Sequence, residues 1–114
     1  TANLGDSRVY RYTHGALTQL TRDHRFALGG RHELYQYLGA SDEDTEISPT
    51  IGKIDRVTGE RLLLCTDGVS RKLSDEELAA MLTAHPDAGD AAGAIIAAVK
   101  SVATDNATVL VVDL

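Results

Sequence analysis

Apolar and polar residues alternate with a period of two in the first segment of the chain, as they do in half-buried strands. Residues 8–12 combine this alternation with β-branched and aromatic side chains, so they are predicted to form a strand. Residues 13–16 include a glycine and are predicted to be a hairpin turn, and residues 17–20 are predicted to be the returning strand. The chain is therefore predicted to open with a β-meander.

The middle of the chain has a weaker pattern. Residues 21–30 lose all periodicity and end in a glycine pair, so they are predicted to be a loop. Residues 31–38 carry apolar or aromatic side chains compatible with two turns of helix, closed by Gly39. The acidic residues 41–46 are predicted to be an exposed connection. Residues 47–54 contain proline and glycine, which indicates an irregular or edge strand.

Two short apolar runs in the second half are predicted to be buried strands. Residues 62–65 are apolar without interruption and too few for a buried helix, so a strand buried on both faces is predicted. Residues 107–112 are predicted to be a second fully buried strand. The first run ends at Asp67 and Gly68, which are common turn residues. A carboxylate at the rim of a sheet is also well placed to hold a metal ion or a polar ligand.

Two helices are predicted between these strands. Ser74 and Glu77 have the spacing of a capping box, and the helix that they begin is expected to run to about residue 84. It should stop there because Pro86 cannot continue it. Residues 90–102 place apolar side chains on one helical face and are predicted to form the second helix.

The composition is that of an ordinary globular protein, and a single domain over residues 1–114 is expected. The net charge of −6 and the dispersed Lys and Arg residues argue against a nucleic-acid partner. No segment resembles a membrane span or a signal peptide, so no membrane partner is expected. The lone Cys65 lies in an apolar run, which favours an inert thiol and a cytoplasmic location. The chain begins at a threonine, and we expect it to be a piece of a longer protein.

Three aspartates are predicted to meet at one edge of the sheet. Asp67 follows the first buried strand and Asp105 precedes the second, so antiparallel pairing would bring the two carboxylates together. Asp6 lies in a turn and could reach the same edge. Carboxylate oxygens suit Mg²⁺ or Mn²⁺ better than zinc. Each aspartate taken alone is better explained as a turn or cap residue, and only the placement of all three makes a shared metal site an equal alternative.

Four strings in the chain resemble a known family. They are ANLGDSRVYRY at residues 2–12, LTRDH at residues 20–24, LLLCTDGVS at residues 62–70 and DNATVLVV at residues 105–112. In their order and with the intervening helices, they resemble the PPM-type (type 2C-like) Mg²⁺/Mn²⁺-dependent protein serine/threonine phosphatases, especially those of bacterial signalling. The chain looks like the C-terminal half of such a catalytic domain.

The resemblance implies an α+β fold that is part of a four-layer αββα sandwich with antiparallel sheets. It implies that Asp67 and Asp105 ligate one ion of a binuclear metal pair, and that Asp6 helps to hold a further ion. The implied reaction is hydrolysis of phosphoserine or phosphothreonine in a phosphoprotein substrate by a metal-activated water. No phosphoenzyme is needed, in agreement with the absence of an evident activated nucleophile in the sequence.

Five further residues are expected to support this site. They are Gly5, Arg8, His24, Gly68 and Asn106. Arg8 could orient Asp6 through a paired contact, although a surface arginine on a strand explains it equally well. His24 could act as an acid near the leaving group, but a structural role is favoured. The other histidines are predicted to be solvated in turns or at helix ends: His14, His32 and His85.

The chain departs from the family pattern in two ways. The N-terminal half, with its own metal motif and phosphate-binding arginine, has no counterpart, so the isolated chain is predicted to bind metal weakly and to have little or no activity. The flap after the Thr-x-Asp-His motif is short, with residues 24–31 before the next predicted helix. Two rival functions remain open, a non-catalytic phosphatase-like regulatory or binding domain and a phosphohydrolase of small molecules. Loss of half a sandwich would also expose apolar surface that favours self-association.

Overall fold

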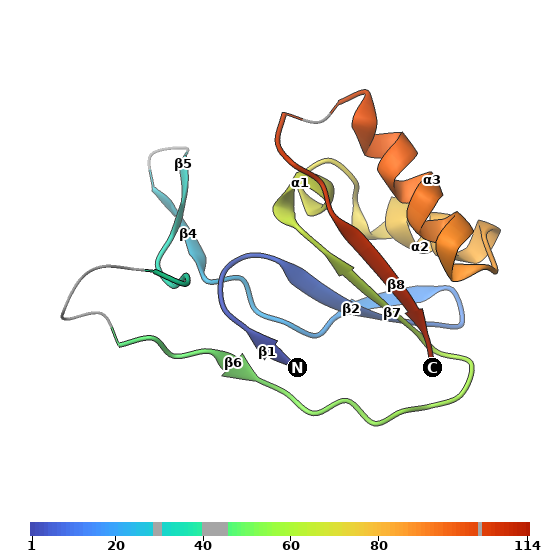
Figure 1. Ribbon diagram of the computed structural model, residues 1–114, viewed down its shortest axis with the longest axis horizontal. Helices are drawn as coiled ribbons and strands as arrows, with labels where there is room; N and C mark the ends of the chain where they lie inside the picture. Colours follow the sequence, from blue (N-terminus) through green and yellow to red (C-terminus); the bar gives the residue numbers. More distant parts are fainter. Residues whose placement is uncertain (29–30, 40–45, 103) are drawn as a thin grey trace.

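A four-stranded antiparallel sheet with two helices on one face forms the centre of the computed structural model, which describes residues 1–28, 31–39, 46–102 and 104–114 (Figure 1). The strand order is β3-β2-β7-β8. The strands are β2 (Arg8–Thr13), β3 (Ala16–Gln19), β7 (Arg61–Cys65) and β8 (Val109–Asp113), and the helices are α2 (Asp75–Ala84) and α3 (Ala88–Lys100). The predicted α+β class with antiparallel sheets is confirmed.

The predicted meander is confirmed as the β2–β3 hairpin. Thr13 pairs with Ala16, so only two residues make the turn. Those residues, His14 and Gly15, have φ values of 50° and 83°. Two successive positive φ angles are the geometry of a tight hairpin turn whose twist matches that of the strands, and glycine adopts it without steric cost.

The main hydrophobic core lies between the sheet and its two helices. Tyr10 and Leu63, on the two central strands, are fully buried, and Val111 of β8 is 8% exposed. The helices contribute the buried side chains Leu78, Leu82, Ala91, Ile95 and Val99. Burial of a large aliphatic side chain stabilises the fold by about 1.5–3 kcal/mol, so these contacts are the main attachment of the helices to the sheet.

The opposite face of the sheet is much less covered. The strand register aligns Val9 with Leu64 and Leu64 with Leu110, which gives one row of aliphatic side chains across three strands. None of the three is fully buried, and Leu110 is 53% exposed. The prediction that residues 62–65 and 107–112 are strands is correct, but the prediction that both are buried on both faces is wrong, because the described helices cover one face only (Figure 1).

The predicted helix over residues 31–38 is wrong. Arg31–Leu34 is a strand, β5, which pairs with Arg25–Leu28, β4, in a separate two-stranded sheet. Part of the predicted loop over residues 21–30 is therefore also strand. Eight residues are few for a helix that lacks a packed face, and strand pairing satisfies the backbone instead. Two short segments separated by two glycines are a hairpin signal that the sequence prediction missed.

Two helix starts follow from capping. In α2, the Ser74 side chain accepts a hydrogen bond from the Glu77 backbone N–H and the Glu77 carboxylate accepts one from the Ser74 N–H, which confirms the predicted capping box. The second helix begins earlier than predicted, because Asp87 accepts a hydrogen bond from the Asp90 N–H and serves as its N-cap.

The C-terminal end of α2 is held by a buried arginine. The Arg61 guanidinium donates to the carbonyls of Leu82, His85 and Pro86.

The remaining elements are short. Strands β1 (Ala2–Asn3) and β6 (Thr50–Ile51) pair with each other, so the predicted edge strand is confirmed, and α1 (Asp67–Ser70) is a single turn. The acidic connection at residues 41–46 falls almost wholly outside the described residues. Within the described ranges, every helix is too short or too polar to cross a membrane.

Gly68 provides a test of this packing. A Cβ atom at this position would collide with the carbonyl oxygen of Asn106 and lie 2.9 Å from its carbonyl carbon, so backbone would have to move. Gly68→Ala should lower the free energy of unfolding by about 1–3 kcal/mol in urea denaturation. The matched control is Gly93→Ala in α3, where the added methyl group meets nothing within 4 Å, and it should stabilise the helix by about 0.5–1 kcal/mol. Equal effects of the two substitutions would contradict the close contact.

Candidate metal site at one edge of the sheet

The strand register brings the three predicted ligand positions to one edge of the sheet. Arg8 pairs with Cys65 and Cys65 pairs with Val109, and all of these pairings are antiparallel. Asp6 lies just before β2, Asp67 just after β7 and Asp105 a short distance before β8. The turns that carry these residues therefore lie toward the edge where β7 ends; the strand directions predicted this for Asp67 and Asp105, and Asp6 was expected only to be able to reach it.

Backbone contacts hold the turn of Asp67 against the turn of Asp105. The Thr66 N–H donates to the Thr108 carbonyl at 3.1 Å, and the Thr108 N–H donates to the Thr66 hydroxyl at 3.0 Å. Gly68 packs directly on the Asn106 carbonyl. Its lack of a side chain is what lets the two turns approach, as expected from the sequence.

The side chains at this edge are engaged in ion pairs. The Arg71 guanidinium lies 3.0 Å from a carboxylate oxygen of Asp67 and 3.4 Å from one of Asp6. Arg25 lies 3.9 Å from the same oxygen of Asp6. The Asp105 carboxylate instead accepts a hydrogen bond at 2.8 Å from the N–H of Asn106. Arg71 was not predicted, although an arginine four residues after an aspartate in a helical turn is a recognisable pair.

These contacts decide whether the carboxylates fit a metal ion. Among the residues that the structure describes, no three His, Cys, Asp or Glu side chains are grouped so that they could hold one. Asp6 and Asp67 share a guanidinium, and Asp105 does not join them. The described residues therefore do not form a complete metal site by themselves. Metal ligation by Asp67, Asp105 and Asp6 stays a prediction.

Arg8 does not contact Asp6, which corrects one of the two predictions for it. Its guanidinium forms a two-pronged ion pair with Asp23, with the closest N–O distance 2.9 Å, and also donates to the Tyr10 hydroxyl at 2.8 Å. Asp23 was missed, although it lies in the LTRDH string. A planar guanidinium matches both carboxylate oxygens, so Asp23 is the better partner for Arg8.

This cluster shifts the pKa values of its members. Burial raises the pKa of the Asp23 carboxyl, but hydrogen bonding and attraction from Arg8 and Arg25 outweigh burial and leave it below its ordinary 3.8. The hydrogen bond to Asp23 raises the pKa of Arg8 above its ordinary range. Burial raises the pKa of Tyr10 to about 12 despite the opposing contact with Arg8. The ionised Arg8–Asp23 pair is therefore the stable form at neutral pH.

His24 has the structural role that the sequence favoured. It is 4% exposed, its Nδ1 accepts a hydrogen bond from the Gly5 N–H at 3.2 Å, and its Nε2 lies 2.9 Å from the Thr50 hydroxyl. Gly5 has a φ of 110°, which favours glycine, and its carbonyl accepts from the His24 N–H at 2.9 Å. The imidazole thus fixes the turn that carries Asp6. His32, predicted in a turn or at a helix end, belongs to strand β5.

The burial of Cys65 argues against a role as a nucleophile. Cys65 is 5% exposed, and burial raises the pKa of its thiol to about 11. A thiol with that pKa is almost wholly protonated at neutral pH and is a poor nucleophile. The predicted inert role of Cys65 agrees with both observations.

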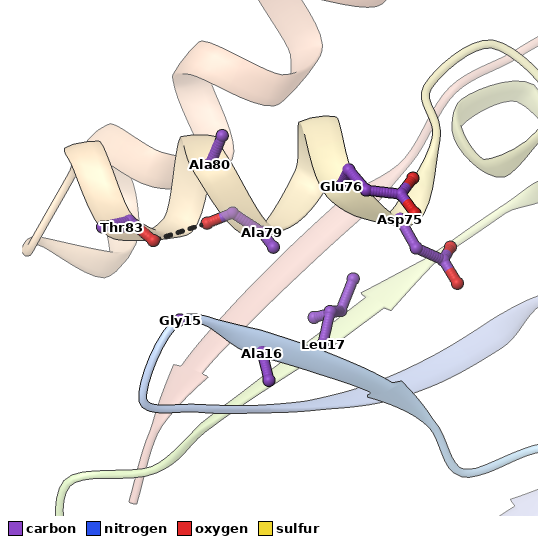
Figure 2. Close-up of a pocket in the computed structure, with 8 residues that line it drawn as sticks. All are labelled: Gly15, Ala16, Leu17, Asp75, Glu76, Ala79, Ala80 and Thr83. Atoms are coloured by element: carbon purple, nitrogen blue, oxygen red, sulfur yellow. Dashed lines mark hydrogen bonds between the residues drawn. The ribbon is translucent and has the colours of Figure 1, made fainter.

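One cavity lies away from the three aspartates. It has a volume of about 460 Å³ and separates β3 from the flank of α2, with Leu17 on one side and Ala79, Ala80 and Thr83 on the other (Figure 2). None of the three aspartates lines it. A smaller cavity of about 380 Å³ is lined in part by Asp105, Asn106 and Lys100. This cavity adjoins the turn that carries Asp105.

Comparisons with known proteins give a consistent result. The chain is 32% identical to the serine/threonine protein phosphatase PstP of Mycobacterium tuberculosis over 97% of its own length and 24% of that protein. It is 31% identical to the serine/threonine phosphatase stp of Listeria monocytogenes over 98% of its length and 50% of that protein. No protein-family profile matches the chain.

Solved structures agree in fold. The PPM Ser-Thr phosphatase MsPP of Mycobacterium smegmatis, in complex with cacodylate, is similar with a TM-score of 0.84 and 31% identity, over 99% of this chain and 54% of that one. The catalytic domain of PstP in complex with two manganese ions is similar with a TM-score of 0.80 and 32% identity, over 98% and 51%. The chain thus spans about half, or less, of the proteins that it matches.

The Arg8–Asp23 pair predicts an acid-dependent contribution to stability. The folded-state pKa of Asp23 is lowered, so the contribution is fully present above its unfolded value of about 3.9 and is lost as the pH falls through the folded value. Asp23→Asn should lower the free energy of unfolding by about 1–3 kcal/mol at pH 7, because Arg8 is left without its partner. The difference from wild type should shrink in urea titrations below pH 4.

The control for this experiment is Asp55→Asn. Asp55 is exposed, and its recorded contact with Arg11 uses the backbone carbonyl, so the substitution should leave stability almost unchanged at every pH. A constant difference between Asp23→Asn and wild type from pH 7 to pH 2 would show that the ionised carboxylate is not what stabilises the fold.

Proposed function

We propose that this chain, which belongs over nearly its whole length to the PPM-type serine/threonine phosphatases, forms part of a catalytic domain. The proposed domain hydrolyses phosphoserine and phosphothreonine in proteins. The observation that carries the proposal is the shared edge at the end of β7. Asp67 and Asp105 come there from separate turns, held together by the Gly68–Asn106 contact. Rigid strand ends that present carboxylates to one side are well suited to position a reaction centre.

A divalent cation, Mg²⁺ or Mn²⁺, is the proposed cofactor. Support comes from the acidic oxygen donors at the edge and from the similar PstP domain, which was crystallised with two manganese ions. When bound, such an ion supplies an activated water and neutralises phosphate charge. This chain holds only part of the required ligand set in its described residues, so further ligands must come from the rest of the domain.

The rest of the domain is also the proposed partner of the open sheet face. The row of Val9, Leu64 and Leu110 is aliphatic and incompletely covered. In the proposed four-layer sandwich, a second sheet supplied by the N-terminal half would cover this face. We therefore expect the chain by itself to have little or no phosphatase activity and to self-associate through this surface.

One observation favours a second candidate, a phosphatase-like domain that binds or regulates without catalysis. Arg71 neutralises both Asp6 and Asp67, and a carboxylate that already shares its charge with a guanidinium is a poorer metal ligand. In that case the fold would be retained without turnover. The two candidates differ in measurable activity.

Turnover of a phosphothreonine peptide tests the proposal. The protein should be prepared in a form that supplies the remainder of the phosphatase domain, and phosphate release should be measured with Mn²⁺. Wild type should release phosphate, and Asp67→Asn should lower kcat/KM by about 100-fold because a ligand is lost. The control is Asp55→Asn, which should retain full activity. Asp55 is exposed and lies in the sequence twelve residues before Asp67.

An absence of Mn²⁺-dependent turnover in wild type would reject the catalytic function and favour the regulatory candidate. Equal turnover by wild type and Asp67→Asn would leave catalysis standing but remove Asp67 from the site. Faster turnover of a small phosphoester than of the peptide would favour the small-molecule phosphohydrolase.

A further inference from the structure

The Arg71 guanidinium lies between two carboxylates from different parts of the chain. It is 3.0 Å from Asp67 and 3.4 Å from Asp6, measured from the same terminal nitrogen. The Asp67 and Asp6 side chains are 22% and 13% exposed, so the pair is partly withdrawn from water. One positive charge therefore neutralises two acids that the strand register brings together.

The position of Arg71 is fixed by its backbone. Its N–H donates to the Asp67 carbonyl at 3.0 Å, and Val69, which belongs to α1 itself, is fully buried. Leu73, two residues after Arg71, is also buried, and its N–H donates to the Val69 carbonyl. Arg71 lies on the same side of the helical turn as Asp67, because the two residues are four positions apart.

The position of Asp6 is fixed independently. The preceding Gly5 is bonded through both its N–H and its carbonyl to the buried His24. Arg25 adds a second positive charge 3.9 Å from Asp6. Asp6 and Asp67 are thus held facing a common cation by two separate anchors, neither of which depends on the ion pair itself.

A guanidinium and a divalent cation compete for the same carboxylate oxygens. Each needs the negative charge of the acid, and the two cations repel each other when close. Arg71 is 39% exposed, so its side chain has solvent into which it can move.

We propose that Arg71 is a built-in counter-ion that competes with a divalent metal ion for Asp6 and Asp67. Metal binding at these two acids requires the guanidinium to leave them, so Arg71 lowers the metal affinity of this edge. The inference rests on the proposed metal-dependent function and concerns the affinity of the site rather than the reaction. It also explains why Asp6 and Asp67 are close to each other without a third acid.

Titration of the 114-residue chain with Mn²⁺ tests the proposal. Isothermal titration calorimetry, supported by the electron paramagnetic resonance signal of free Mn²⁺, should compare wild type with Arg71→Ala. The substitution should tighten Mn²⁺ binding by about five-fold, the scale of a partly exposed ion pair. Mn²⁺ should also raise the melting temperature of Arg71→Ala more than that of wild type, because tighter binding stabilises the folded state further.

Lys72→Ala is the matched control. Lys72 is the adjacent residue, is exposed, carries the same charge and forms no recorded contact with either acid, so its loss should leave Mn²⁺ affinity unchanged. Arg71→Lys keeps the charge but not the planar fork and should give an intermediate affinity. Circular dichroism of each variant shows whether the fold is retained.

Three results would overturn the proposal. The first is an Mn²⁺ affinity of Arg71→Ala that is equal to or weaker than that of wild type. The second is an equal gain in Mn²⁺ affinity in Lys72→Ala, which would indicate a general charge effect. The third is an absence of Mn²⁺ binding by both wild type and Arg71→Ala. None of these decides the proposed phosphatase function, which is judged by peptide turnover in the longer protein. A successful titration without turnover would support the counter-ion and reject the enzyme.

Discussion

The contact between Gly68 and the Asn106 carbonyl is the constraint on which the candidate site depends. Any larger residue at position 68 would push the turn after β7 away from the turn before β8. The paired hydrogen bonds of Thr66 with Thr108 extend the β7–β8 ladder up to this point, so the sheet stays regular almost to the acids. The separation of Asp67 from Asp105 is thereby set by backbone packing, which leaves the side chains to be positioned by charge.

Three arginines then pair with the acids near this edge. Arg8 and Asp23 form an ion pair that ties β2 to the segment after β3, and His24 in that segment fixes the turn of Asp6. Arg25 contacts both Asp23 and Asp6, and Arg71 contacts both Asp6 and Asp67. A network of this kind holds its members more firmly than an isolated surface pair would, because moving one member leaves several charges unpaired. Binding of a cation to Asp6 and Asp67 would therefore require the Arg71 guanidinium to move away from them.

Much of the fold was predictable from local pattern, and the misses have physical causes. The β2–β3 hairpin and the Ser74–Glu77 capping box depend on residues close in sequence, so their signals are complete in the chain. The β4–β5 hairpin was taken for loop and helix, because four-residue strands carry little periodicity and their pairing decides their structure.

The edge shared by Asp67 and Asp105 followed from strand direction. The partners of Arg8 and Asp6 did not, because ion pairs between distant residues depend on side-chain geometry that no spacing encodes. The open row around Leu110 was predicted to be buried because an apolar run does not show which part of a protein covers it.

The central claim is that a divalent cation binds this chain at the edge where β7 ends, close to Asp67 and Asp105. Paramagnetic broadening of backbone amide signals by substoichiometric Mn²⁺ in nuclear magnetic resonance spectra tests it most directly, since broadening falls steeply with distance from the ion. The amides of Gly68 and Asn106 should broaden first, while those of Gly15 and Thr83, which line the cavity between β3 and α2, should stay sharp (Figure 2). Early broadening at Gly15 and Thr83, or sharp signals at Gly68 and Asn106 throughout, would contradict the claim.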